Sequence, residues 1–394
     1  MPSAQIPTPH ETLSAADIDK VVPHHPGAEW PTDLVTTPSG PRVIRKGEAA
    51  ATATYQECTG YTFLINSMKR PRIVRLDTGR IVLVATAWLH KTGAEVPILM
   101  TSDDEGKSWS QPREVNFHDQ LVDLGGGKVG CFGGQCVFSD DGGATWTKPQ
   151  PLKLPGANAS GAHGTIVNDG KRLAGVFFAE SDPHGPVDWT AYSYLRFSED
   201  LGRTWGDPVQ LPPDWCTSEG AVTVARDGAL VAALRTGPQR SVLDALAGTT
   251  DSLIGYNDHW RRITTARTID DGETWTDHQV HFRWGKTHSE LITLPNGDIL
   301  LTYAVRSGEL DGQAYHGIEA VLSHDNGKTW DWPNRYYLFR WDMMVSMHSP
   351  QSVRLGNGRI LTVFLYHYNA SWGKRILPAA QNIGIVDAII WEVK

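Results

Sequence analysis

The chain has 394 residues, of which 40% are hydrophobic and 20% charged, and its formal net charge at pH 7 is −8. This length is enough for one large hydrophobic core or two ordinary domains. The acidic balance argues against a nucleic-acid partner, because neutralising phosphates requires a basic face, whereas an anionic small substrate needs only a few local Arg or Lys side chains. No stretch of about 18 apolar residues is present, so we expect no membrane-spanning helix.

Residues 1–35 are interpreted as an N-terminal extension and residues 36–394 as a single domain. The chain begins "MPSAQIPTPHETLSAADIDK", which lacks the basic start and the apolar run of a signal peptide. We therefore expect a cytoplasmic protein, or a secreted or periplasmic one if a leader has been trimmed away.

An eight-residue motif recurs along the rest of the chain. It reads "SDDEGKSW" at 102–109, "SDDGGATW" at 139–146, "SEDLGRTW" at 198–205 and "SHDNGKTW" at 323–330, with a weaker copy, "TIDDGETW", at 268–275. Before each copy, apolar stretches alternate with Asp-Gly or Asn-Gly turns, which indicates antiparallel hairpins. We interpret the motif as a turn between a third and a fourth strand. Its Asp bonds backbone N–H groups, its Gly adopts a positive φ and its Trp packs between sheets.

The repeat predicts the fold class. Six units start near residues 70, 118, 163, 219, 288 and 348, and the last lacks the motif but has matching strands. Residues 36–69, including "YTFLINS", can supply a missing strand and close the ring, and no helix of useful length is expected between residues 30 and 394. The prediction is an all-β, six-bladed β-propeller of four-stranded antiparallel blades, in preference to seven blades.

Four cysteines are too few and too scattered for a disulfide scaffold. Cys131 and Cys136 flank "FGGQ" and can be neighbours on a hairpin. They are either joined by a disulfide or are two small buried residues.

A ring of polar residues is expected where the first strand of each blade begins. The residue nine positions before the Gly turn of the blade is charged or an imidazole in four blades, and His163 and His348 stand close to the same level. Burying so many polar groups is costly unless they pair, bind water or meet a ligand. We interpret the ring as a pocket, with a water-filled polar plug as the alternative. Its members are Arg70, His118, His163, Glu219, His288 and His348.

A divalent metal is a further possibility for this ring, and otherwise no cofactor is expected. Neutral imidazoles with one carboxylate suit Zn²⁺, Mn²⁺ or Fe²⁺. The ligands would be His118, His163, Glu219, His288 and His348.

The five motifs resemble the Asp-box (BNR) repeat of the sialidase superfamily, over roughly residues 60–394. Because that superfamily includes sialidases, arabinanases, polysaccharide lyases and proteins without enzymatic activity, the resemblance implies the fold more strongly than the chemistry. In "EGAVTVARDGALVAALR", Glu219 and Arg235 match a family Glu that polarises a nucleophilic Tyr and a family Arg that holds the substrate carboxylate; the alternative for Arg235 is a salt bridge to Glu219. In "KRPRIVRL", Arg70 matches another carboxylate-binding Arg, with Arg72 as a rival.

The chain also departs from the family pattern. Where related sequences read "GIRA" and supply a third Arg, this chain reads "GIEA" with Glu319, so that Arg306 or the nearby His316 is the expected substitute. Where the nucleophilic Tyr is usual in "GYPSSV", this chain reads "HSPQSV" with His348 and Ser349. The acid/base Asp is missing, and Glu95 is the only carboxylate in "LHKTGAEVPIL". The chain is therefore expected to differ from the usual retaining sialidase mechanism.

Three functions remain open, each with an acidic oligosaccharide or polysaccharide as the partner. The first is a sialidase-like exo-glycoside hydrolase, in which Glu219 is the base or helper of the nucleophile and His163 or Glu95 donates a proton. The second is a lyase that cleaves a uronate-containing glycan by β-elimination, with His163 and His288 as catalytic groups. The third is a non-catalytic glycan-binding propeller. In all three, Trp189 in the insert at 181–193 is a candidate for stacking on a sugar.

Overall fold

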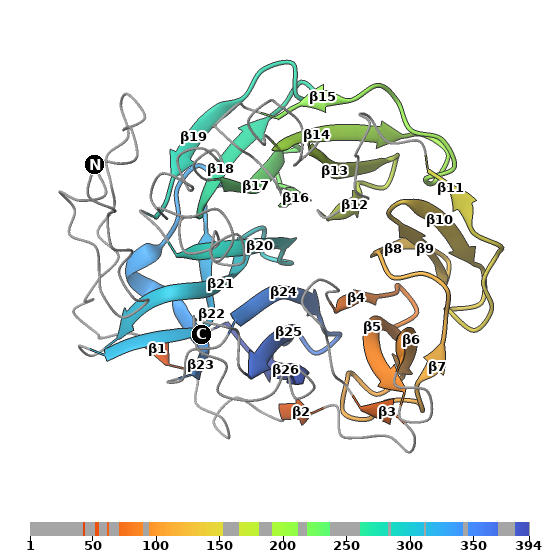
Figure 1. Cartoon of the computed structure of the whole chain (residues 1–394). Coiled ribbons are helices and arrows are strands. Elements are labelled where there is room, and N and C mark those ends of the chain that lie inside the picture. Colours follow the sequence, from red (N-terminus) through yellow and green to blue (C-terminus); the bar gives the residue numbers. More distant parts are fainter. Residues whose placement is uncertain are drawn as a thin grey trace, which may run out of the picture.

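The computed structural model describes residues 42–43, 52–54, 61–62, 71–89, 94–152, 165–180, 191–211, 219–236, 261–282, 285–310, 313–341, 346–368 and 383–393. Within these ranges the chain forms six antiparallel sheets arranged around a central axis, so the predicted all-β, six-bladed propeller is confirmed (Figure 1). The one helical element in the described ranges is a 3₁₀ turn at Trp332–Asn334. None of the described helical structure is long and apolar enough to cross a membrane.

Each blade is a meander whose first strand is innermost. The first blade contains β4 (Arg72–Arg75), β5 (Ile81–Leu89), β6 (Ala94–Ser102) and β7 (Arg113–Glu114); the second contains β8 (Gln120–Gly125), β9 (Lys128–Phe132), β10 (Gln135–Ser139) and β11 (Gln150–Pro151). The third contains β12 (Ile166–Asn168), β13 (Leu173–Glu180), β14 (Ala191–Ser198) and β15 (Val209–Gln210); the fourth contains β16 (Gly220–Val224), β17 (Leu230–Thr236), β18 (Arg262–Thr268) and β19 (Thr276–Val280). The fifth contains β20 (Lys286–Thr293), β21 (Ile299–Leu310), β22 (Gln313–Ser323) and β23 (Tyr336–Trp341), and the sixth contains β24 (Ser346–Arg354), β25 (Ile360–Tyr368) and β26 (Ile383–Trp391).

The ring closes through a strand from the N-terminal side of the chain. β2 (Thr52–Thr54) pairs antiparallel with β26 and is the outermost strand of the sixth blade. The expected closing strand from 36–69 is therefore confirmed, but "YTFLINS" does not provide it, since β3 (Tyr61–Thr62) pairs with β5 of the first blade. A third short strand, β1 (Arg42–Val43), lies parallel to β23. Each inner strand contacts the next around the ring, and β24 contacts β4.

The recurring motifs form turns stabilised by their own side chains. In the copy at 139–146, Ser139 Oγ donates to Asp141 Oδ1 over 2.7 Å, and the Thr145 N–H and hydroxyl donate to the two Asp141 oxygens over 2.8 and 2.6 Å. These hydrogen bonds lower the pKa of Asp141 to about 2, with those from Thr145 as the largest cause. The same bonds recur at Asp104, Asp200, Asp270 and Asp325.

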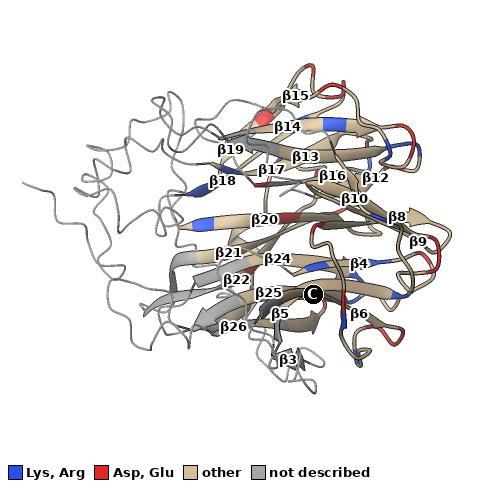
Figure 2. Ribbon diagram, turned by 45° about the vertical axis from the view of Figure 1, so that its right-hand side comes forward, with Lys and Arg blue, Asp and Glu red and all other residues tan. Residues whose placement is uncertain are grey.

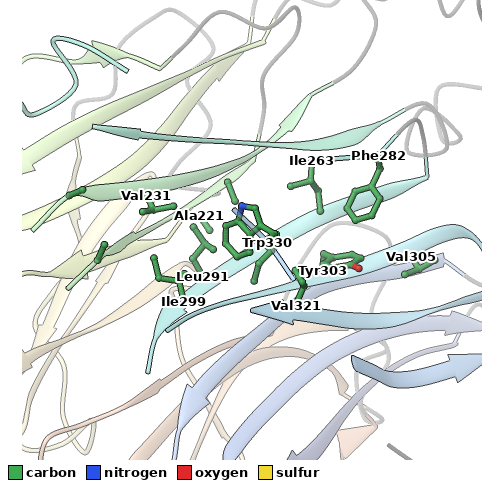
Figure 3. Packing of buried hydrophobic residues seen from close by; sticks show 14 of the residues in the cluster. Ala221, Val231, Ile263, Phe282, Leu291, Ile299, Tyr303, Val305, Val321 and Trp330 are labelled. Carbon is green, nitrogen blue, oxygen red and sulfur yellow. The ribbon is translucent and has the colours of Figure 1, made fainter. Parts of the chain in front are cut away.

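Apolar side chains between neighbouring blades form the core. Between the fourth and fifth blades, Val231 and Ile263 pack with Tyr303 and Trp330, all of them buried (Figure 3). Trp330 ends the motif of the fifth blade, and its Nε1 donates to Thr265 Oγ1 of the fourth blade over 3.2 Å. The predicted role of this Trp, packing between sheets, is thereby confirmed.

The two cysteines near the "FGGQ" turn are neighbours on the β9–β10 hairpin, as expected, but both are free thiols. Cys131 lies opposite Val137, while Cys136 lies opposite Phe132, so the two are one position out of register. Consecutive register positions face opposite sides of a sheet. Cys131 accordingly packs towards the first blade and Cys136 towards the third, which rules out the disulfide.

Candidate functional site

The inner strands of all six blades begin at one end of the propeller, which we call the mouth. Because the third strand of each blade runs parallel to the first, the motif turns that end the third strands lie at the opposite end. Figure 2 shows this separation, with acidic motif turns far from the beginning of β20. The mouth is therefore where the sequence-predicted ring must lie.

Three members of the predicted ring have described side chains. His118 stands two residues before β8, Glu219 immediately precedes β16, and His288 lies in β20, so all three are at the mouth. In the third blade, the Thr165 N–H donates to the Gly220 carbonyl over 3.1 Å, which places the residue before β12 level with the start of β16. The remaining predicted site residues lie outside the described residues, either wholly (Arg70, His163, Trp189) or in their side chains (Glu95, Arg306, His348).

Glu219 and Arg235 face each other across the β16–β17 hairpin. The Arg235 N–H donates to the Glu219 carbonyl over 2.8 Å, and Arg235 Nε lies 3.8 Å from Glu219 Oε2. The two side chains are 9% and 12% exposed, so the carboxylate is largely desolvated but still reachable. Glu219, immediately before β16, thus meets Arg235 on the return strand of the same hairpin, as the alternative interpretation of Arg235, a salt bridge to Glu219, predicts.

His288 joins this pair from the next blade. Its Nε2 lies 3.1 Å from Glu219 Oε2, and its side chain is 3% exposed. When Nε2 carries the ring proton, it donates to the carboxylate and leaves Nδ1 as the acceptor. The mouth thus holds a carboxylate between a guanidinium and an imidazole at the junction of the fourth and fifth blades.

The backbone is irregular at the mouth in the fifth and sixth blades. β20 has a register shift between Thr287 and Glu290, and His288 within it has a φ of +55°. β24 has a register shift at the equivalent place, and Ser349 within it has a φ of +46°. A left-handed conformation costs a residue with a Cβ atom about 1–2 kcal/mol. Bulges of this kind re-aim side chains and are common beside active sites.

The metal hypothesis finds limited support in the described part of the chain. No group of three or more His, Cys, Asp or Glu side chains within the described ranges is arranged to hold a metal ion. Of the proposed ligands with described side chains, Glu219 and His288 meet, and His118 does not join them in such a group.

A second polar cluster, which the sequence did not reveal, lies in the channel at the inner strands. Gln351 Nε2 donates to Glu290 Oε2 over 3.2 Å and to Gln120 Oε1 over 3.0 Å, while its Oε1 accepts the Ile73 N–H over 3.0 Å. These bonds connect the first, second, fifth and sixth blades. The sequence feature that could have indicated this cluster is a Glu or Gln within an otherwise apolar inner strand, as in "SELIT" and "PQSV".

Burial dominates the protonation of the acids near this cluster. It raises the pKa of Glu290 to about 8 and that of Asp119 to about 6, although the positive charge of Arg72 opposes both shifts. The same burial lowers the pKa of Arg72. Arg72, the rival to Arg70 in the sequence, is thus placed near the buried Glu290 and the partly buried Asp119.

The comparisons with known proteins agree with this architecture. No protein-family profile matches the chain. A sialidase from Paraclostridium sordellii is 29% identical over 173 residues, which cover 40% of this chain and 34% of that protein, or about a third of its length. Among solved structures, a protein of unknown function from Dyadobacter fermentans has a TM-score of 0.59 at 19% identity, covering 87% of this chain and 100% of that one.

Two further solved structures are of proteins that carry the names of glycan-acting enzymes. The intramolecular trans-sialidase from Ruminococcus gnavus has a TM-score of 0.56 at 13% identity, covering 86% of this chain and 97% of that one. The α-L-arabinanase of Penicillium chrysogenum has a TM-score of 0.54 at 12% identity, covering 86% and 98%. The chain has the sialidase-type propeller fold. Within that fold, Glu219, Arg235 and His288 occupy the mouth.

Glu319, which replaces the third arginine of the sialidase pattern, belongs to the core of this sialidase-type propeller. It is buried, accepts a hydrogen bond from the Tyr303 hydroxyl, and lies 3.3 Å from Arg335 Nε. Burial and the neighbouring Glu319 charge raise the pKa of Tyr303 well above its usual value. The carboxylate at this position is thus engaged within the fifth blade.

Proposed function

We propose that this protein is a glycoside hydrolase that acts on a carboxylate-bearing sugar or glycan at the mouth of the propeller. The observation that carries the proposal is the Glu219 carboxylate, which is largely buried and held between Arg235 and His288. The sialidase relative and the trans-sialidase and arabinanase neighbours supply the context of carbohydrate chemistry.

Each of the three residues has a role in this proposal. Glycoside hydrolysis passes through a transition state with positive charge on the sugar, which a nearby carboxylate such as Glu219 stabilises. Arg235 offers a planar guanidinium that matches the two oxygens of a substrate carboxylate. His288 fixes the orientation of Glu219 through the 3.1 Å contact. The proton donor is Glu95, at the beginning of β6 and hence at the mouth, or His163.

Hydrolysis is preferred to the two other functions considered. In β-elimination a histidine removes a proton from carbon, which His288 Nδ1 could still do, so the preference for hydrolysis rests on the sialidase, trans-sialidase and arabinanase among the similar proteins. A glycan-binding role without catalysis requires no carboxylate buried beside a guanidinium at the mouth.

The test uses fluorogenic aryl glycosides of N-acetylneuraminic acid, glucuronic acid and arabinofuranose. We expect cleavage of an acidic glycoside and none of the arabinofuranoside. Glu219→Gln keeps the volume and removes the charge, and kcat should fall at least about a hundredfold. Arg235→Lys keeps the charge but loses the planar arrangement of the guanidinium donors. We expect kcat/KM to fall about thirtyfold or more, which corresponds to a loss of about 2 kcal/mol in transition-state stabilisation.

The matched controls are Glu199→Gln and Arg80→Lys, which make the same changes at surface ion pairs. Both should retain activity, and all four variants should remain folded by circular dichroism. Near-normal turnover in Glu219→Gln would remove that residue from the mechanism. An unsaturated uronate product, detected by its ultraviolet absorbance, would replace hydrolysis with elimination.

A further inference from the structure

Ser349 stands in the sixth blade where His288 stands in the fifth. Each lies nine residues before the Gly turn of its blade, each has a positive φ, and each falls within the register shift of its inner strand. β20 and β24 contact each other, so the two positions are neighbours on the ring. Glu219, nine residues before its own Gly turn, holds the same position one blade earlier.

Two features make a serine at this position unfavourable for folding. Its φ of +46° lies in the left-handed region, where a Cβ atom is penalised and glycine is not. Its side chain is buried, at 4% exposure, and Oγ has no hydrogen-bond partner among the described residues. A buried hydroxyl without a partner is itself destabilising. Glycine would remove both costs, so a serine at this position calls for a reason outside folding.

We infer that Ser349 is a substrate-binding residue whose hydroxyl hydrogen-bonds a hydroxyl or ring oxygen of the sugar bound beside His288 and Glu219. The inference deepens the proposed function and rests on it. A serine hydroxyl both donates and accepts, which suits a sugar hydroxyl. Its χ1 angle has three staggered positions, so Oγ is not restricted to a single direction. The bulge holds the backbone so that this short side chain can reach the ligand.

Two substitutions separate the hydroxyl from the backbone conformation. Ser349→Gly removes the hydroxyl and relieves the left-handed strain, so the melting temperature should rise by about 1–2 °C. Ser349→Ala removes the hydroxyl and keeps the strained backbone, so the melting temperature should be no lower than that of the wild type and should rise less than in Ser349→Gly. In both variants kcat/KM on the glycoside cleaved by the wild type should fall about five- to tenfold, the effect of losing one neutral hydrogen bond.

The matched control is Asn326→Gly. Asn326 also has a positive φ, of 64°, but it lies in a motif turn at the end opposite to the mouth. Its replacement should leave kcat/KM unchanged. If Ser349→Ala and Ser349→Gly both keep wild-type kcat/KM while Glu219→Gln loses it, the inference about Ser349 is wrong and the proposed function stands.

A binding measurement keeps the inference testable without turnover. The free monosaccharides N-acetylneuraminic acid and glucuronic acid, at millimolar concentration, should raise the melting temperature of the wild type and have a smaller effect on Ser349→Ala. An equal rise in both proteins, or no rise in the wild type, would overturn the inference. If the wild type cleaves none of the glycosides but the monosaccharides still raise its melting temperature more than that of Ser349→Ala, the proposed function is wrong and the inference about Ser349 stands.

Discussion

Replacing Glu290 with Gln should remove a pH dependence of stability that the channel imposes on the fold. Glu290 is 8% exposed, and burial raises its pKa from an ordinary value of 4.5 to about 8. The folded protein therefore holds a proton that the unfolded chain releases between these two pH values. Since the folded state binds more protons, the free energy of unfolding falls as pH rises through this window.

The size of the expected fall in the free energy of unfolding depends on the pH interval over which Glu290 is the main group that changes protonation. Below pH 6.5 the buried His281 has the opposite effect on stability. Burial lowers the pKa of His281 from 6.5 to about 3, so the free energy of unfolding rises with pH up to 6.5 through this residue. Between pH 6.5 and 8 the Glu290 contribution remains. At 1.36 kcal/mol for each pH unit, the free energy of unfolding should fall by about 2 kcal/mol over this interval.

The assay is urea unfolding of the wild type and Glu290→Gln at pH 6.5 and 8. Glutamine keeps the shape of the protonated acid, and its Oε1 can accept the bond from Gln351 Nε2. We expect a loss of about 2 kcal/mol in the wild type and almost none in the variant. Glu199→Gln, at a side chain that is 75% exposed, is the control and should behave as the wild type. A wild-type stability that rises over this interval, or a variant that keeps the full loss, would refute the reasoning.

Three further predictions concern the regular part of the propeller. Asp141→Ala removes the hydrogen bonds of one motif turn and should lower the free energy of unfolding by about 1–2 kcal/mol, with activity per folded molecule unchanged in a glycosidase assay. Gly327→Ala should destabilise the protein by about 2 kcal/mol or more in urea unfolding, because its φ is +82° and the new Cβ would lie 2.8 Å from a Val231 methyl. Deleting residues 1–56 removes β2 from the sixth blade together with β1, which pairs with β23, and should lower the melting temperature, measured by calorimetry, whereas an unchanged value would mean that β2 does not hold the ring closed.

The fold could be predicted because its determinants are local in sequence. Each motif turn is held by bonds between residues two to four positions apart, such as those of Ser139, Asp141 and Thr145, so each copy specifies its own geometry. The Glu219–Arg235 pair was equally accessible, since a hairpin fixes which residues face each other. The contact with His288 followed from a constant offset to the Gly turn, which holds because equivalent strands start at the same level.

The channel cluster could not be predicted because its contacts cross the ring. Gln351 bonds the Ile73 backbone from 278 residues away, and Glu290 meets it only where the inner strands converge. The register shifts also interrupt the two-residue alternation from which the facing of a strand is predicted. The raised pKa of Glu290 follows from burial, a property of the assembled fold. The division at residue 36 and the cytoplasmic location stay predictions.

The two ends of this propeller differ in how far their polar residues are stabilised by neighbouring residues in the sequence. This difference indicates at which end the substrate binds. At the end with the motif turns, carboxylates such as Asp141 are hydrogen-bonded by neighbours, and residues with positive φ, such as Asn326, lie in turns between strands. At the mouth, Ser349 and His288 are in the left-handed region inside bulges, and Glu219 is largely buried beside Arg235. A fold selected for stability alone would replace such residues at little structural expense. Five regular turns supply stability that tolerates these departures, which is why we place substrate binding at the mouth.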